Sequence, residues 1–148
     1  MSATNAFETS LLSLIFNNAN IANIGDATGL RGSTTAGSLY VSLHTADPGE
    51  AGTQTTSEAN YTGYARVAVA RSGAGWTVSG NAFSNAAAVA FGPCTSGSNT
   101  ITHFGIGTDA SGTGNLLFKG ALTASITVTS TSNQTQTFAI GQLSGTAD

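Results

Sequence analysis

The chain has 148 residues, of which only 7% are Asp, Glu, Lys or Arg, and its formal net charge is −3. An ordinary soluble domain carries about 25% charged residues, so this composition leaves few groups for acid–base catalysis and few cations for phosphate binding. It argues against an enzyme and against a nucleic-acid partner.

Further features of the composition limit the class of protein. No apolar run reaches the roughly 18 residues of a membrane-spanning helix, so no membrane partner is expected. Cys94 is the one cysteine, which excludes an intrachain disulfide. The first eight residues lack the basic region of a secretory signal, so we expect synthesis in a cytoplasm. Leu, Ile, Val and Phe make up about a fifth of the chain, a low value that predicts further burial against other subunits.

The first predicted element is an amphipathic helix that begins near Asn5. Asn5 and Glu8 have the spacing of a capping box. An apolar stripe follows at helical spacing: Phe7, Leu11, Leu14 and Ile15, widened by Leu12. The asparagine-rich residues 17–20 should end the helix, and residues 25–37, rich in Gly, Ser and Thr, should form a loop. Residues 1–24 are therefore expected to form an N-terminal helical arm.

Residues 38–44 predict the first strand. Leu39, Val41 and Leu43 alternate there with more polar residues, in the pattern of a half-buried strand. The sequence Asp47-Pro48-Gly49-Glu50 then fits a type II turn, which needs a positive φ at its glycine.

Seven or eight short strands are expected in total. An exposed loop at residues 51–63 separates the first strand from the rest. Further strands are predicted at residues 64–70, 76–78, 82–91, 102–106, 116–122, 125–129 and 135–143. Short strands with turns between them predict a mainly β fold: an antiparallel β-sandwich or small barrel, with one N-terminal α-helix over a face or open end. We expect a single β-rich domain of residues 1–148, in which residues 38–143 form the β-domain.

The residues that could carry chemistry lack the partners that catalysis or metal binding requires. His44 and Asp47 are three residues apart, but zinc needs three or four ligands, and His103 is predicted in a different strand. We expect His44 to cap a strand end and Asp47 to open the turn. Cys94 lies in a loop without an adjacent base, as an inert thiol would. No catalytic, cofactor-binding or metal-binding residue is therefore predicted.

Two acidic and three aromatic residues are the remaining candidates. Glu50 and Glu58 could form the paired carboxylates of a glycosidase, but solvated loop charges are the better interpretation. Tyr61, Tyr64 and Trp76 form the one cluster with binding potential, since aromatic rings on loops stack on sugars or anchor a protein partner. The alternative is that Tyr64 and Trp76 border the core, as large aromatic side chains usually do.

Four stretches carry a resemblance that covers most of the chain: residues 37–49, GSLYVSLHTADPG; 61–69, YTGYARVAV; 103–108, HFGIGT; and 114–122, GNLLFKGAL. In these stretches the chain is similar to small virion structural proteins of tailed bacteriophages, of the tail-fibre-like or capsid-decoration type. The resemblance implies a location in the virion and other virion proteins as partners, such as the major capsid or tail protein. It supplies no catalytic or ligand residue.

Three functions follow as hypotheses. We expect a multi-copy capsid decoration or cement subunit, a homo-oligomer and most simply a trimer, that stabilises the particle by protein–protein contacts. Its helix or N-terminal arm would dock onto a shell protein. The alternative is a tail-fibre or tail-tip adhesin that binds a host glycan or receptor through loop aromatics such as Tyr61. The third is a small hydrolase, against which the missing catalytic groups argue.

Overall fold

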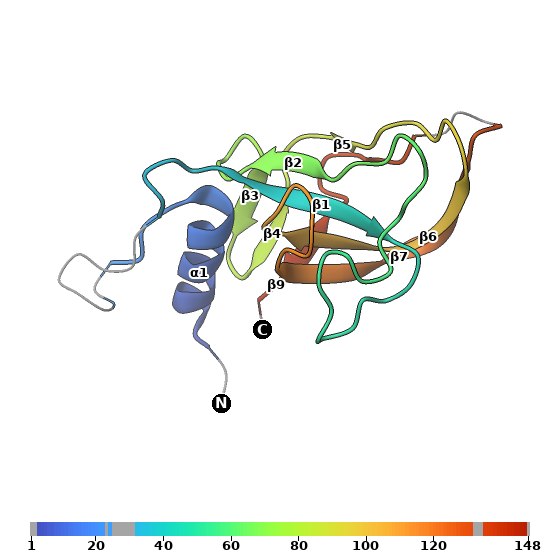
Figure 1. Ribbon diagram of the computed structural model, residues 1–148. Coiled ribbons are helices and arrows are strands. Elements are labelled where there is room, and N and C mark those ends of the chain that lie inside the picture. The colour runs from blue at the N-terminus through green and yellow to red at the C-terminus, as the bar shows by residue number, and fades with distance from the viewer. Residues whose placement is uncertain (1–2, 23, 25–31, 132–134, 148) are drawn as a thin grey trace. The chain divides into compact units, whose positions relative to one another are not determined.

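The computed structural model describes residues 3–22, 24, 32–131 and 135–147, and Figure 1 shows their helix and strands. The elements in chain order are α1 (Asn5–Asn17), β1 (Ser38–His44), β2 (Val67–Ala70), β3 (Trp76–Ser79), β4 (Ala82–Asn85), β5 (Val89–Ala90), β6 (Ser98–Gly107), β7 (Leu116–Thr129), β8 (Thr137–Phe138) and β9 (Ser144–Thr146).

The described strands form three sheets, with the orders β2-β1-β6-β7, β3-β4-β9 and β5-β8. The β1–β6, β6–β7, β3–β4 and β4–β9 pairs are antiparallel. The prediction of a mainly β, antiparallel fold with one N-terminal helix is confirmed, and the sheets are open rather than closed into a barrel. No helix in the described residues is long and apolar enough to cross a membrane.

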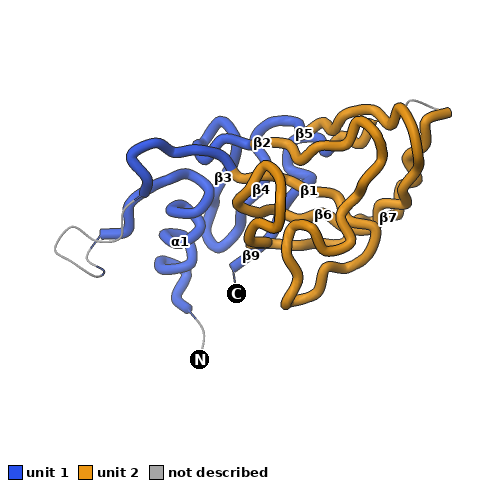
Figure 2. The backbone as a smooth tube through the Cα atoms, viewed as in Figure 1, with its two compact units in different colours: residues 1–38, 69–88, 138–148 blue, residues 39–68, 89–137 orange. Residues whose placement is uncertain are grey.

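The chain divides into two compact units, which Figure 2 shows in different colours. Unit 1 contains residues 1–38, 69–88 and 138–148, and unit 2 contains residues 39–68 and 89–137. Within unit 1, α1 contacts β3 and β4. The division into a helical arm of residues 1–24 and a β-domain of residues 38–143 stays a prediction.

The helix α1 turns a different face toward unit 1 than its sequence predicts. Its buried residues are Glu8, Leu12 and Phe16, each four positions after the last. Phe16 stacks on Phe83 with ring centroids 4.1 Å apart and lies 4.8 Å from the ring of Trp76. These contacts with the aromatic side chains of β3 and β4 explain why Phe16 is buried. Because successive residues are about 100° apart on a helix, this arrangement turns Phe7, Leu11 and Leu14 away from the core. Leu12, which widened the predicted stripe, is buried as expected.

The predicted stripe of α1 remains partly exposed. Phe7 is 42% exposed, and Leu11, Leu14 and Ile15 are half-buried. The start of the helix also differs from the prediction, because Thr4 and not Asn5 is the N-cap residue, and the Thr4 side chain makes no capping hydrogen bond. The helix ends as expected at asparagines, with Asn18 in the left-handed region at φ 56°.

Arg71 holds the C-terminal end of α1 in place. Its Nε and Nη2 atoms donate to the carbonyl oxygens of Ile15 and Leu14, both at 2.7 Å, and Nη1 donates to the carbonyl of Ala36 at 3.0 Å. The last four carbonyls of a helix lack partners within the helix, and a cation near that end also interacts favourably with the helix dipole. Arg71 therefore stabilises this end in both ways.

The strand β1 has the predicted bounds and positions the chemistry of unit 2. Leu39, Val41 and Leu43 are buried as expected, and Val41 pairs with Ile106 of β6. The expectation of a half-buried strand is wrong at its second half, because Ser42 and His44 on the other face are also fully buried. The turn that follows has the predicted positive φ, 74° at Gly49.

Other strand bounds depart from the prediction. β2 is shorter than the predicted strand at residues 64–70, and residues 82–91 divide into β4 and β5. β6 begins at Ser98, before the strand predicted at residues 102–106, and the predicted last strand, residues 135–143, contributes only the short β8. The last described strand, β9, was not predicted, because Ser144–Thr146 carries no apolar side chain to mark it.

The segments predicted at residues 116–122 and 125–129 belong to one strand, β7. The predicted break coincides with an irregularity in the ladder between β6 and β7. Ile101 pairs with Ile126 and His103 pairs with Ala121, so Thr102 alone faces residues 122–125 of β7. Such a bulge interrupts side-chain alternation without ending the strand.

Candidate functional site

Five of the six charged side chains of unit 2 form two clusters, which we name after their cations. The Arg66 cluster consists of Arg66, Glu58 and Tyr64 with the backbone carbonyls of Asp109 and Gly112. The Lys119 cluster consists of Lys119, Asp47 and Glu50. In a chain with so few charges, this concentration makes unit 2 the first place to search for a site.

Arg66 is almost enclosed, with a side chain that is 3% exposed. Nε and Nη2 donate to the two carboxylate oxygens of Glu58 at 2.7 and 2.8 Å, a bidentate pair. Nη1 and Nη2 also donate to the carbonyls of Asp109 and Gly112, at 2.9 and 2.7 Å. The hydrogen bonds to Glu58 raise the pKa of Arg66. Since a guanidinium has five N–H donors and four bonds use them here, Arg66 serves to hold the loop at residues 109–112.

Glu58 lies at the centre of the Arg66 cluster. The prediction that Glu58 is a solvated loop charge is wrong. Its side chain is 16% exposed, and besides both Arg66 contacts its Oε1 accepts a hydrogen bond from Tyr64 Oη at 2.8 Å. The same Tyr64 Oη accepts the backbone N–H of Leu43 at 3.1 Å, and burial raises the pKa of Tyr64. Residues 51–63 are therefore a loop fastened to β1, in which Gln54, Ala59 and Tyr61 are buried while six of the thirteen residues are exposed as predicted.

Gln54 fastens the same glycine-rich loop from a second side. Its side chain is fully buried, and its Oε1 accepts the backbone N–H of Asp109 at 2.9 Å. Its own backbone N–H donates to the carbonyl of Thr113 at 3.1 Å. Gly114 allows this approach, because a Cβ there would lie 2.1 Å from Gln54 Oε1. Arg66 and Gln54 together fix the tip between β6 and β7.

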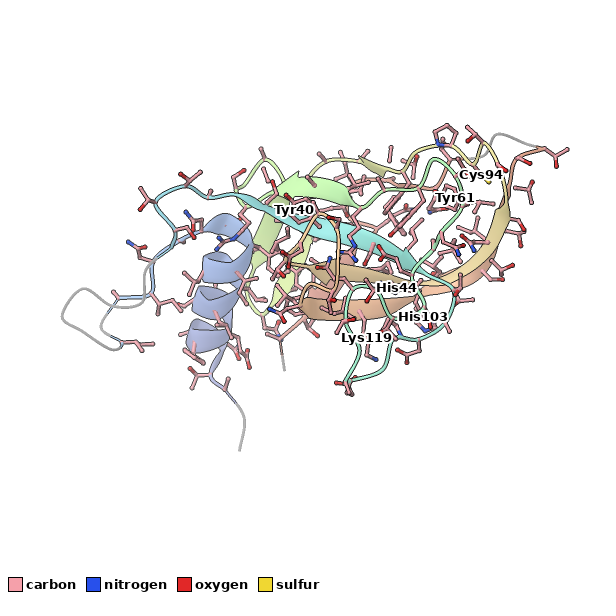
Figure 3. The ribbon with its side chains drawn as sticks, in the orientation of Figure 1. Tyr40, His44, Tyr61, Cys94, His103 and Lys119 are labelled. Carbon is pink, nitrogen blue, oxygen red and sulfur yellow. The ribbon has the colours of Figure 1, made fainter. Side chains whose placement is uncertain are left out.

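His44 lies inside unit 2 and bonds to uncharged groups. Its Nε2 is 2.8 Å from Ser42 Oγ, and its Nδ1 is 2.8 Å from the carbonyl oxygen of Thr56. A carbonyl only accepts, so Nδ1 carries the proton and donates, and Nε2 of the neutral ring accepts from the hydroxyl. Burial lowers the pKa of His44, which keeps the ring neutral. Figure 3 labels His44 on β1 and His103, its register partner on β6.

Ser42 and His44 have the contact of a nucleophile and its base but not the access that catalysis needs. Both side chains are 0% exposed. Gly105 packs directly over them, and a Cβ there would lie 2.7 Å from Ser42 Oγ and from His44 Nε2. The third position of a triad, next to Nδ1, is taken by the Thr56 carbonyl instead of a carboxylate. The pair therefore satisfies buried polar atoms within the sheet.

The structure places Asp47 in the turn and does not pair it with His44. Its Oδ1 accepts the backbone N–H of Gly49 at 2.9 Å. This hydrogen bond, with a further contribution from Lys119, lowers the pKa of Asp47. Lys119 Nζ lies 3.1 Å from carboxylate oxygens of both Asp47 and Glu50, and these contacts raise the pKa of Lys119. Glu50 is 95% exposed, so the Lys119 cluster is a surface ion-pair group.

Two of the three predicted aromatic residues, Tyr61 and Trp76, are buried, and so is Cys94. Tyr61 is 3% exposed, donates from its Oη to the carbonyl of Gly92 at 3.1 Å, and packs edge-on against Tyr64. Trp76 is 0% exposed and belongs to unit 1, whereas Tyr61 and Tyr64 belong to unit 2. Cys94 is fully buried, with its Sγ 3.4 Å from the carbonyl oxygen of Gly97. Tyr61, Trp76 and Cys94 therefore present no face to a ligand, whereas Tyr64 is half-buried and lines an open depression.

Two open depressions border the charged clusters. One, of about 320 Å³, is lined by Glu58, Ala59, Tyr64, Ala65, Arg66, Ala110, Ser111 and Gly112. The other, of about 280 Å³, is lined by Gly49, Glu50, Gly52, Leu116, Leu117, Phe118 and Lys119. In the part of the chain that the structure describes, no three His, Cys, Asp or Glu side chains are grouped to hold a metal ion.

Sequence reasoning missed the role of Arg66 and Gln54. Glu58 and Arg66 are eight positions apart, a spacing that does not bring side chains together within one helix or strand, so their pairing depends on how the loop folds back. One signal was available: an arginine inside the stretch YTGYARVAV, between predicted strand residues, needs a partner if that stretch is buried.

A comparison with known families gives the chain its place. A family model described as "Podophage GP4 fiber I protein gp80" matches residues 2–146. A search among curated proteins found no match. The resemblance to structural proteins of tailed phages is thereby confirmed for the fibre type. Because the match covers nearly the whole chain, the protein belongs to this podophage fibre family and is a structural component of the bacteriophage virion.

Proposed function

We propose that the protein is a multi-copy structural subunit of the phage fibre that binds other virion proteins by surface contacts and catalyses no reaction. The observation that carries the proposal is the family match over residues 2–146. We prefer the fibre to the capsid-decoration role that the sequence favoured, because the family description names a fibre protein.

The use of polar groups supports this structural role. Arg66 and Gln54 bind loop backbone, Arg71 binds the end of α1, and the Ser42–His44 pair lies buried. A catalytic site needs such groups poised toward a substrate, with their hydrogen-bonding capacity still open. Here that capacity is used to order the chain.

The exposed side chains supply contact area for protein partners. The large apolar side chains that are exposed among the described residues are Phe7, Ile24, Leu117 and Ile140. Exposed apolar side chains on a chain with 7% charged residues favour protein–protein contact, since charges are depleted in the core of protein interfaces. The partners we propose are neighbouring virion proteins and further copies of this chain.

The adhesin hypothesis keeps a fibre location but loses its proposed contact residue. Tyr61, the aromatic ring offered for glycan stacking, is 3% exposed and hydrogen-bonded through its hydroxyl. A receptor site on this chain would therefore have to use another surface.

An amber mutation in the gene tests the proposal. Particles grown in a non-suppressing host are purified and imaged by negative-stain electron microscopy, and their adsorption is measured. The fibre role predicts intact heads without the fibre, restored when the chain is supplied from a plasmid.

Two results would count against this function. Particles with normal fibres but heads that release DNA on mild heating would place the chain on the capsid. Purified wild-type particles that lack the chain would remove it from the virion altogether. A suppressing host provides the matched control, because the same mutant phage then makes full-length protein.

A further inference from the structure

The outward side of α1 has the pattern of a helix–helix seam. Phe7, Leu11 and Leu14 follow one another at spacings of four and three residues, which is the a/d spacing of a coiled coil. Phe7 is 42% exposed, and Leu11 and Leu14 are half-buried. We call these three residues the α1 seam.

The α1 seam is separate from the side that α1 uses within unit 1. That inner side carries Leu12 and Phe16, with 1% and 0% exposure. At about 100° per residue, the centres of the two sides lie roughly 130° apart around the helix. One helix of three to four turns therefore offers a core-facing surface and a second apolar surface that is partly exposed.

Charge favours a second copy of the same helix as the occupant of the seam. Glu8 is the one charged residue of α1, and it is buried on the inner side. Two α1 helices packed through their seams would therefore bring no like charges together. A spacing of three and four residues matches a helical partner, and α1 is the only helix in the described residues, so a helix from another copy of this chain must be α1.

We infer that copies of this chain associate through their α1 seams, with the α1 helices side by side and parallel. This inference deepens the proposed function and rests on it for direction: copies that share a fibre axis point the same way. Phe7, Leu11 and Leu14 then each face the same residue of a neighbouring copy.

Cysteine crosslinking of the purified full-length chain tests the arrangement. Phe7→Cys and Leu14→Cys are oxidised separately, each in a Cys94→Ala background. In parallel helices each position meets its own copy, within the Cα separation of about 7 Å that a disulfide allows. Both variants should form covalent dimers, since each chain then carries a single cysteine. Ala6→Cys is the matched control, because Ala6 is exposed on the same helix but lies about 100° from Phe7.

A charged pair tests whether the seam drives the association. Phe7→Asp with Leu11→Asp should weaken self-association in analytical ultracentrifugation by about a hundredfold or more, because like charges would oppose each other across the seam. Ala6→Asp with Ser13→Asp adds the same charge away from the seam and should leave association unchanged. Far-UV circular dichroism of both variants checks that the chain is still folded.

Several results would overturn the inference. A folded wild-type monomer at every concentration reached would remove it. Association that survives the Phe7/Leu11 charges would place the contact elsewhere, for example on the edge strand β7. Crosslinking at Leu11→Cys but at neither Phe7→Cys nor Leu14→Cys would show antiparallel helices. These outcomes concern isolated protein, so they leave the amber-mutant test of the fibre role untouched.

Discussion

At Arg66, a guanidinium that is 3% exposed depends on Glu58 for its compensating charge. Removing one partner of a buried ion pair costs far more than removing an exposed one, because the remaining charge stays desolvated. Tyr64 also loses its acceptor if Glu58 is the residue removed. One of the few cations of the chain therefore serves to hold the loop at residues 109–112 in place.

Arg66→Ala should lower the free energy of unfolding by about 2–3 kcal/mol, since Glu58 would be left without its partner and the carbonyls of Asp109 and Gly112 without their donor. Urea denaturation followed by tryptophan fluorescence measures it. Lys119→Ala is the matched control and should change stability little, because its partner Glu50 is 95% exposed. Equal effects of the two substitutions would contradict the role assigned to Arg66.

His44 makes stability depend on pH. Burial lowers the pKa of His44 below the ordinary value of 6.5. Between the two pKa values, His44 is therefore protonated in the unfolded chain and neutral in the folded chain. The contribution of neutral His44 is therefore fully present above about pH 6.5 and is lost as the pH falls toward the folded-state pKa. The slope in that window is at most about 1.4 kcal/mol per pH unit.

Thermal unfolding from pH 7.5 to pH 5 measures this dependence. The melting temperature should fall as the solution becomes more acidic. His44→Asn should be less stable throughout, because the bonds to Ser42 and Thr56 change, but should show a shallower slope. A slope that His44→Asn leaves unaltered would assign the proton uptake to another group.

Single residues were predictable from sequence where the interaction is local. Asp47 and Gly49 take their expected places in the turn, because an Asx hydrogen bond and a positive φ need only four residues. The Arg66 cluster was not predictable, because it joins three separate parts of the chain. These are the loop that contains Glu58, the residues just before β2 that contain Arg66, and the glycine-rich tip between β6 and β7. The spacing of these residues along the chain does not indicate that they meet in the fold.

At the level of elements, α1 shows how a neighbour decides which side of a helix is buried. Its sequence contains two overlapping apolar patterns, one through Phe7, Leu11 and Leu14 and one through Leu12 and Phe16. The second is buried because Phe83 and Trp76 provide an aromatic site for Phe16. Tertiary packing thus overrode the longer stripe, which periodicity alone had favoured.

Phe16→Ala and Phe7→Ala compare the two patterns within one helix. Phe16→Ala should cost about 3–5 kcal/mol, because it leaves a cavity beside Phe83 and Trp76. Phe7→Ala should cost less than about 1 kcal/mol in the monomer, since that ring is 42% exposed. Chemical denaturation at low protein concentration measures both. A larger loss for Phe7→Ala would mean that the predicted stripe, and not Phe16, packs against the strands.

Strands were predictable in proportion to their apolar alternation. β1 was predicted at its full length, since Leu39, Val41 and Leu43 alternate strictly. The short β9 was not predicted, because it contains Ser, Gly and Thr and depends on pairing with β4 for its conformation. In β7 the bulge at residues 122–125 interrupted the alternation and suggested two strands where there is one.

At the scale of the whole molecule, composition and family point in the same direction. A chain with 7% charged residues uses Arg66, Arg71 and Gln54 to order its own loops and helix end. Its exposed apolar side chains are the surface that we propose for contacts with other proteins. Membership of the fibre family is consistent with this proposal, since the match extends over residues 2–146.

Cryo-electron microscopy of purified wild-type particles tests the central claim most directly, because it locates the chain and counts its copies together. The account predicts density for this fold in the fibre, in several copies per fibre. It would be contradicted by density for this fold on the capsid alone, or by particles that carry none of it.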